Sequence, residues 1–226
     1  MNCLVITGHY GSGKTELALH QAMIWHKDNH HNLCLCDVDV INPYFRAREQ
    51  KQWLEEQGIH LVAPSEELMH ADLPIISPEV LAKLKDLNSS VILDAGGDHD
   101  GATAIGQFSE SIKARSHEFW FVANLNRPQV STKEKIMEMI DRIERKARLR
   151  ITGLIHNTHL AGGDFPVEEL ISHERVVREV AAEKNIPLVG TMVERKVYDK
   201  WDPEKKNNIK DLIIFSRKLT APWHSV

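Results

Sequence analysis

A glycine-rich segment with one lysine is the first part of this sequence whose spacing points to chemistry. The run from Gly8 to Thr15, GHYGSGKT, matches the pattern G-x-x-x-x-G-K-[ST]. Glycines let the backbone wrap a phosphate with its N–H groups pointing inward, and a helix starting there presents its positive end to the same anion. Lys14 would reach the β- and γ-phosphates of a nucleotide, and the Thr15 hydroxyl would bind Mg²⁺. We expect the nucleotide to be bound by Gly8, Gly11, Ser12, Gly13, Lys14, Thr15 and Glu16.

A second segment of interest is the apolar run Val91–Leu93, which ends on Asp94 and is followed by Gly96 and Gly97. This pattern is typical of a Walker B element, whose carboxylate lies beside the phosphate loop and binds Mg²⁺, usually through water. The two glycines allow the backbone to approach a γ-phosphate and to move when it leaves. We therefore expect Asp94 to bind the metal and Gly97 to contact the nucleotide.

A third segment, LCLCDVDV, places Asp37 and Asp39 at the end of a short apolar run. Alternation along a strand puts both side chains on the same side, near the carboxyl edge of a sheet. Two carboxylates there fit one residue that supports the metal and one that orients a water molecule. A solvated turn explains the same residues equally well, because Asn42 and Pro43 follow and are typical of turns.

Elements that could position these segments alternate along the whole chain. Short β-branched runs predict strands at 4–7, 33–37, 60–63, 91–94, 119–123, 151–155 and 188–190. Helices are predicted at 14–29, 46–57, 78–87, 103–114, 132–147, 167–183 and 203–218. This order predicts an α/β fold: a doubly wound, mostly parallel sheet of about seven strands with helices on both faces. We expect residues 1–226 to form a single P-loop nucleotide-binding domain.

The composition narrows the classes of partner and the compartment. The 226 residues are 42% hydrophobic and 27% charged, which is typical of a folded globular protein. A net charge of -4 gives no overall attraction to nucleic acid or to anionic lipid. No run approaches the ~20 apolar residues of a membrane span. Three cysteines are too few for a disulfide framework, so a cytoplasmic protein is expected.

Taken together, these motifs resemble the MinD/ParA-type branch of P-loop NTPases, which also includes CobB/CobQ-like ATPases. Two later segments add to the resemblance: Ile155-His156-Asn157, and residues 186–194, which are similar to a P-h-h-G-h-h-P loop near the base. Val193 replaces the second proline of that loop. The resemblance implies that Asp39 orients the attacking water, Asp37 supports Mg²⁺ and Asn157 contacts adenine.

One position departs from this family pattern. Many members carry a signature lysine where this chain has His9, and that lysine reaches the partner's nucleotide across a dimer. Histidine supplies no permanent charge at neutral pH, because its ordinary pKa is about 6.5. Arg46, Arg48 and Arg127 are the alternative cations, although each also fits a surface arginine.

The function expected from these observations is a Mg²⁺-dependent ATPase that acts as a nucleotide-dependent switch, as a homodimer with a protein partner. Lys14 and Asp39 are its expected catalytic residues. A small-molecule kinase or ATP-dependent synthetase, with an acceptor held by residues 98–101 or 124–128, is an alternative. A nucleotide-gated scaffold with negligible turnover is a further one. The guanine-reading motif N-K-x-D is absent, which favours ATP over GTP.

Two groups of residues leave metal binding open. His26 and His30 are one helical turn apart and His31 follows, but a solvated helix end explains them more simply. Cys34 and Cys36 share one face of a strand, where buried packing is the ordinary role of cysteine.

Overall fold

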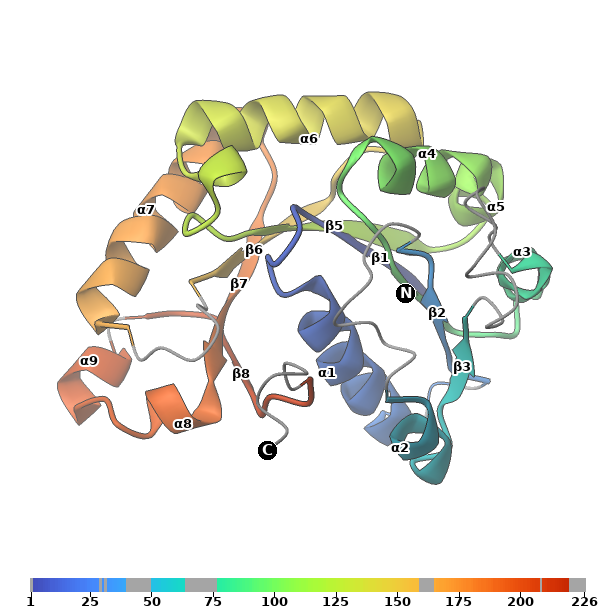
Figure 1. Cartoon of the computed structure of the whole chain (residues 1–226), viewed down its shortest axis with the longest axis horizontal. Coiled ribbons are helices and arrows are strands. Elements are labelled where there is room, and N and C mark those ends of the chain that lie inside the picture. Colours follow the sequence, from blue (N-terminus) through green and yellow to red (C-terminus); the bar gives the residue numbers. More distant parts are fainter. Residues whose placement is uncertain are drawn as a thin grey trace.

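The computed structural model describes residues 2–28, 30, 32–39, 50–63, 77–158, 165–207 and 209–219. Its centre is one parallel sheet of eight strands in the order β3-β2-β4-β1-β5-β6-β7-β8 (Figure 1). The strands are β1 (Cys3–Thr7), β2 (Cys34–Asp37), β3 (His60–Val62), β4 (Val91–Asp94), β5 (His117–Ala123), β6 (Gly153–Asn157), β7 (Leu188–Glu194) and β8 (Leu212–Phe215). The predicted α/β doubly wound fold is confirmed, with eight strands where about seven were expected.

Helices cover both faces of this sheet, as Figure 1 shows. One face carries α1 (Lys14–Lys27) and α2 (Lys51–Glu56), while the other carries α3 (Pro78–Lys85), α4 (His99–Gln107), α5 (Ser109–Lys113), α6 (Lys133–Ala147) and α7 (Val167–Lys184). Three short helices complete the described elements: η3 (Pro128–Val130), α8 (Arg195–Tyr198) and α9 (Pro203–Asn207).

The central strand shows why an unbroken apolar run is needed here. Cys3 and Val5 of β1 pack into the core beneath α3 to α7, whereas Leu4 and Ile6 pack into the core beneath α1 and α2. All four are fully buried because helices cover the sheet on both sides. The polar residues that remain in these strands therefore gather at their carboxyl ends.

The last predicted helix, 203–218, is wrong. Only Pro203–Asn207 is helical, and Leu212–Phe215 forms β8, which pairs in parallel with β7. The residues Leu-Ile-Ile-Phe have strong β propensity, and pairing with the edge of β7 satisfies their backbone groups. The seven-strand expectation fails for the same reason.

Other boundaries shifted by a few residues. The helix predicted at 103–114 begins at His99, where Asp98 caps it, and is divided at Phe108 into α4 and α5. The strand predicted at 151–155 lies at Gly153–Asn157, and β7 continues to Glu194. Of the helix predicted at 46–57, residues 51–56 are helical and 46–49 lie outside the described residues.

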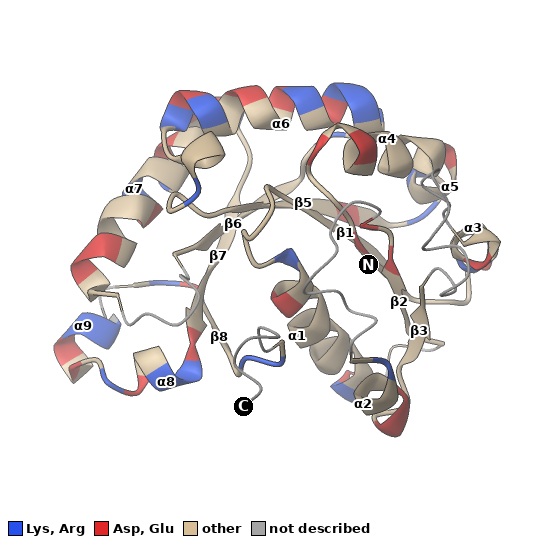
Figure 2. Cartoon of the chain, viewed as in Figure 1, with Lys and Arg blue, Asp and Glu red and all other residues tan. Residues whose placement is uncertain are grey.

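Charged side chains of both signs are interleaved along α6, as Figure 2 shows. No helix in the described part of the chain is long and apolar enough to cross a membrane.

Candidate functional site: a phosphate loop and its acids

The segment between β1 and α1 adopts a turn that depends on glycine. Gly13 has a φ of 98°, a left-handed conformation that strains any other residue. A Cβ atom on Gly13 would also collide with the Asn157 side-chain nitrogen. That nitrogen donates a hydrogen bond to Ser12 O at 2.8 Å, so Asn157 at the end of β6 braces the loop from the side. The predicted contact of Asn157 with adenine stays a prediction.

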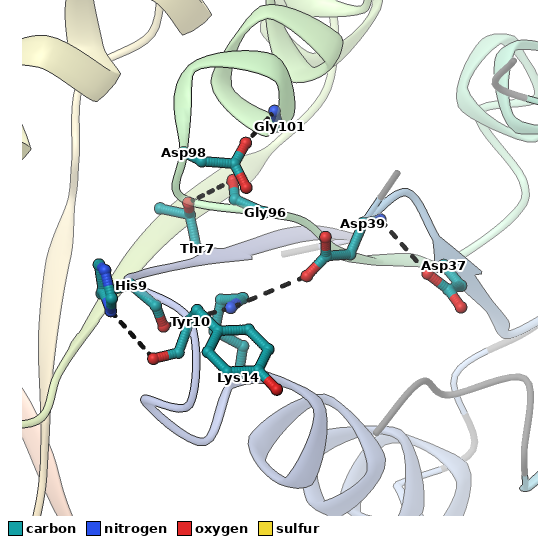
Figure 3. Close-up of polar contacts among 9 residues, drawn as sticks. All are labelled: Thr7, His9, Tyr10, Lys14, Asp37, Asp39, Gly96, Asp98 and Gly101. Atoms are coloured by element: carbon teal, nitrogen blue, oxygen red, sulfur yellow. Dashed lines mark hydrogen bonds and ion pairs between the residues drawn. The ribbon is translucent and has the colours of Figure 1, made fainter. Parts of the chain in front are cut away.

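Lys14 lies inside this loop, almost closed off from solvent (Figure 3). Its Nζ donates to His9 O at 3.4 Å and lies 3.9 Å from Asp39 Oδ2. Lys14 and Asp39 are 5% and 6% exposed, so this ion pair is weakly screened by water. The two predicted catalytic residues are thus neighbours.

The three predicted acids meet because of strand register. Asp37 and Asp94 are direct partners across β2 and β4, and Val38 N donates to Asp94 O at 2.9 Å. Asp39 follows immediately, and its N–H donates to Asp37 Oδ1 at 3.3 Å. All three acids are buried, which places three carboxyl groups around one ammonium group.

Asp94 bears the largest electrostatic strain of the three. Burial raises the pKa of its carboxyl to about 7, and Asp37 and Asp39 raise it further while Lys14 lowers it. Neither carboxyl oxygen has a hydrogen-bond partner among the described residues. A buried carboxyl group of this kind fits a cation.

The donors present fit Mg²⁺ better than a metal held by protein alone. No three His, Cys, Asp or Glu side chains converge as a ready metal site within the described residues. Mg²⁺ commonly uses one or two carboxylates together with phosphate oxygens and water. Asp94 and Asp37, with the buried Thr15 beside them in the loop, match that donor set.

The loop after β4 touches the phosphate loop through bare backbone. A Cβ on Gly97 would overlap the backbone carbonyl of Gly8, so only glycine allows this contact. Thr7, the last residue of β1, donates from Oγ1 to Gly96 O at 3.1 Å (Figure 3). Asp98 then caps α4 by accepting from Gly101 N at 2.7 Å. Thr7 was missed from the sequence, although a polar residue ending an apolar strand was a usable signal.

Arg127 reaches the loop from the end of β5. Its Nε donates to Gly11 O at 3.0 Å, and the fully buried Asn124 donates to the same oxygen at 3.4 Å. Of the three arginines considered as replacement cations, Arg127 is therefore at the phosphate loop. Arg46 and Arg48 lie outside the described residues.

His9 remains neutral at physiological pH. Burial lowers its pKa, and the nearby charges of Lys14, Arg127 and Arg142 lower it further, although a hydrogen bond to Tyr10 O acts in the opposite direction. The position of the signature lysine thus carries no permanent charge.

Glu16 lies in the first turn of α1, but its carboxylate is directed away from the loop. It accepts hydrogen bonds from the backbone N–H groups of Lys218, at 3.1 Å, and Leu219, at 2.7 Å. Its predicted part in nucleotide binding is therefore untested for the side chain, which already has partners in the C-terminal segment.

The groups considered for other metals have ordinary partners. Cys34 and Cys36 are buried with their sulfur atoms 3.6 Å apart. His30 stacks on Trp25 and lies 3.3 Å from Ser90 Oγ, away from any paired role with His26. His31 lies outside the described residues.

A cleft of about 820 Å³ adjoins the outer side of the phosphate loop. It is bordered by His9 and Tyr10 of the loop, by residues 97–99, and by one face of α6 that includes Lys135 and Arg142.

Fold and site together define the class: this is the doubly wound α/β fold of the P-loop NTPases, with the phosphate loop at the carboxyl end of β1. Neither a scan against family models nor a search of curated proteins gives a match.

Solved structures share this fold at low sequence identity. The cell division protein FtsY of Thermotoga maritima aligns with a TM-score of 0.61 and 21% identity, over 90% of this chain and 66% of that one. FtsY from the chloroplast of Physcomitrella patens gives 0.57 and 15%, over 91% and 64%. The signal recognition particle 54 kDa protein of Aeropyrum pernix, in complex with GDP, gives 0.56 and 19%, over 84% and 40%. This chain therefore spans about two thirds or less of each neighbour.

Replacing Asp94 with Asn should remove a pH dependence of stability. Because the pKa of Asp94 is about 7 in the folded protein, against about 4 when unfolded, the folded state binds its proton more tightly. Its contribution is complete below pH ~4 and is lost as pH rises through ~7. Urea unfolding at pH 4.5 and 7.5 should show wild type losing roughly 2–4 kcal/mol relative to Asp94→Asn. Parallel pH profiles for the two proteins would contradict the assignment.

Proposed function

We propose that this chain is a Mg²⁺-dependent ATPase that acts as a nucleotide-dependent switch, built as a single nucleotide-binding domain over residues 1–226. The observation that carries the proposal is the buried Lys14 ammonium, 3.9 Å from Asp39, inside a glycine loop that begins a helix. An ammonium group and inward backbone N–H groups at a helix start form an anion site for phosphates.

Within this proposal each residue has one task. The backbone of Gly8–Thr15 holds the phosphates, and Lys14 neutralises the charge that develops on the γ-phosphate. Asp39, held beside Lys14, orients the attacking water. Thr15, Asp37 and Asp94 would hold Mg²⁺, which when bound neutralises phosphate charge. Gly97 would meet the γ-phosphate through its backbone, since it already lies against Gly8.

ATP is the proposed nucleotide, with GTP as the competitor to test. Absence of N-K-x-D from the sequence favours adenine. The Aeropyrum pernix neighbour was solved with GDP, which is a property of that protein. Titrations with both nucleotides therefore belong in every experiment below.

The resemblance to MinD/ParA-type ATPases supports a cytoplasmic homodimer that works with a protein partner. Because His9 is neutral, Arg127 is the proposed cation at the phosphate loop, acting within its own chain. Dimer formation then has no need of a lysine supplied by the second copy.

A small-molecule kinase is the second candidate, and the cleft beside the loop favours it. About 820 Å³ is enough for a small acceptor, and residues 97–99 place one wall of the cleft next to the loop that meets the γ-phosphate.

Lys14→Ala should weaken MgATP binding about tenfold to a hundredfold, because a buried charge-assisted contact with phosphate is lost. Isothermal titration calorimetry measures this loss. Lys27→Ala, on the exposed far end of the same helix, is the matched control and should bind as wild type does. Unchanged affinity in Lys14→Ala would remove the basis of the site.

Asp39→Ala should bind MgATP normally and lose most phosphate release, since the group that orients water is gone while the phosphate contacts remain. Asp202→Ala, an exposed acid far along the chain, serves as the control. Normal turnover in Asp39→Ala would mean that another group positions the water.

The switch and the kinase differ in their products. Purified protein with MgATP should form ADP and inorganic phosphate in equal amounts without any added acceptor, measured by chromatography and a phosphate assay. ADP formation that begins only when a second substrate is supplied would favour the kinase.

A further inference from the structure

The strand order divides the site into two sides. Asp37, Asp39 and Asp94 follow β2 and β4, which lie on one side of β1. The strands β5, β6, β7 and β8 lie on the other side. A triphosphate whose γ end faces Lys14, Asp39 and the metal-binding acids therefore extends its nucleoside toward the carboxyl ends of β6 to β8. This step rests on the proposed function.

On that second side, the chain beyond β8 is clamped to the first turn of α1. Both oxygens of Glu16 lie 3.1 Å from Lys218 N, and Oε1 also accepts from Leu219 N at 2.7 Å. A carboxylate that accepts from two successive backbone N–H groups makes charge-assisted hydrogen bonds, which are stronger than neutral ones. The contact places residues 217–219 one residue away from Thr15, the last residue of the phosphate motif.

Three further contacts hold this segment in place. Leu219 is 3% exposed and packs into the same core as Leu17 of α1. The Lys218 ammonium lies 4.6 Å from the centre of the Trp53 ring on α2. Arg217 Nε donates to Leu219 O at 2.8 Å. The segment therefore crosses α1 from β8 to α2 as an ordered strap.

A buried acid stands beside the strap at the end of β7. Glu194 pairs in register with Phe215, two residues before Arg217, and is 6% exposed. Its charge contributes to raising the pKa of Glu16, after the larger effect of burial, so the two carboxyl groups are close. Lys196 lies 3.1 Å from one Glu194 oxygen, and a carboxylate has about four acceptor positions.

We propose that residues Arg217–Leu219, clamped by Glu16, and the Glu194 carboxylate form the wall that holds the nucleoside part of the bound nucleotide. The strap supplies shape and backbone polar groups beside α1. Glu194 accepts hydrogen bonds from the hydroxyl or amino groups of the nucleoside, the donors that a purine ribonucleoside offers and that a bare polyphosphate lacks.

The experiment compares a ligand with a nucleoside and one without. Calorimetric titrations use MgATP, MgGTP and magnesium tripolyphosphate against wild type, Glu16→Gln and Glu194→Gln. Each variant should lose about tenfold in affinity for the preferred nucleotide, as expected for one charge-assisted hydrogen bond or its clamp, and should bind tripolyphosphate as wild type does. Glu168→Gln is the matched control, because Glu168 pairs with Lys205 at an exposed position on α7 and α9.

The outcomes separate this inference from the proposed function. Equal losses for nucleotide and tripolyphosphate would mean that Glu16 and Glu194 only support the loop, which overturns the inference. Unchanged nucleotide affinity in both variants overturns it as well. If wild type binds tripolyphosphate as tightly as either nucleotide, the nucleoside is not recognised and only the inference fails. If wild type binds none of the three ligands, the proposed function fails with it.

Discussion

Three carboxyl groups and one ammonium group share a nearly dry space at the carboxyl edge of β1, β2 and β4, and the rest of the site depends on this crowding. Strand register makes it unavoidable, because Asp37 and Asp94 are direct neighbours across β2 and β4. Lys14 offsets part of the repulsion, and the raised pKa of Asp94 shows how much is left. A divalent cation brought by a nucleotide would relieve the remainder, so binding changes the electrostatic balance that fixes the positions of all three acids.

Two contacts between backbones give that change a path outward. Gly97 rests on Gly8 without any intervening side chain, and Thr7 holds Gly96 by a hydrogen bond. The same loop leads into Asp98 and the start of α4. Because α4 packs on α6, displacement of the glycine pair would be passed to the outer helix layer through packed elements. A switch of this build needs no separate effector domain, since its own covering helices report the state of the site.

The parts of this molecule that sequence reasoning found are those whose signal is local. The phosphate loop between β1 and α1 and the acid that ends β4 are written in adjacent residues, so their types and spacing suffice. The predicted fold class followed from the same alternation of short and long elements.

The parts that were missed depend on residues far apart in the chain. The strand Leu212–Phe215 is a strand because β7 offers it an edge, and its own four residues were absorbed into a helical prediction. The clasp of Glu16 on Lys218 and the reach of Arg127 to Gly11 join positions separated by 202 and 116 residues, and no pattern in one sequence records such pairings. Asn157 was expected at adenine from resemblance, while its bond to Ser12 O appears only in three dimensions.

The clasp between Glu16 and the strap also bears on how the protein is made. The two partners are 202 residues apart, so at about 5–20 residues per second the phosphate loop leaves the ribosome roughly 10–40 seconds before Lys218 and Leu219 are synthesised. During that interval the first turn of α1 lacks the backbone N–H groups that neutralise Glu16. The growing chain therefore passes through a stage in which its glycine loop is present but one side of the site is still open, and the nucleotide pocket is closed late in synthesis.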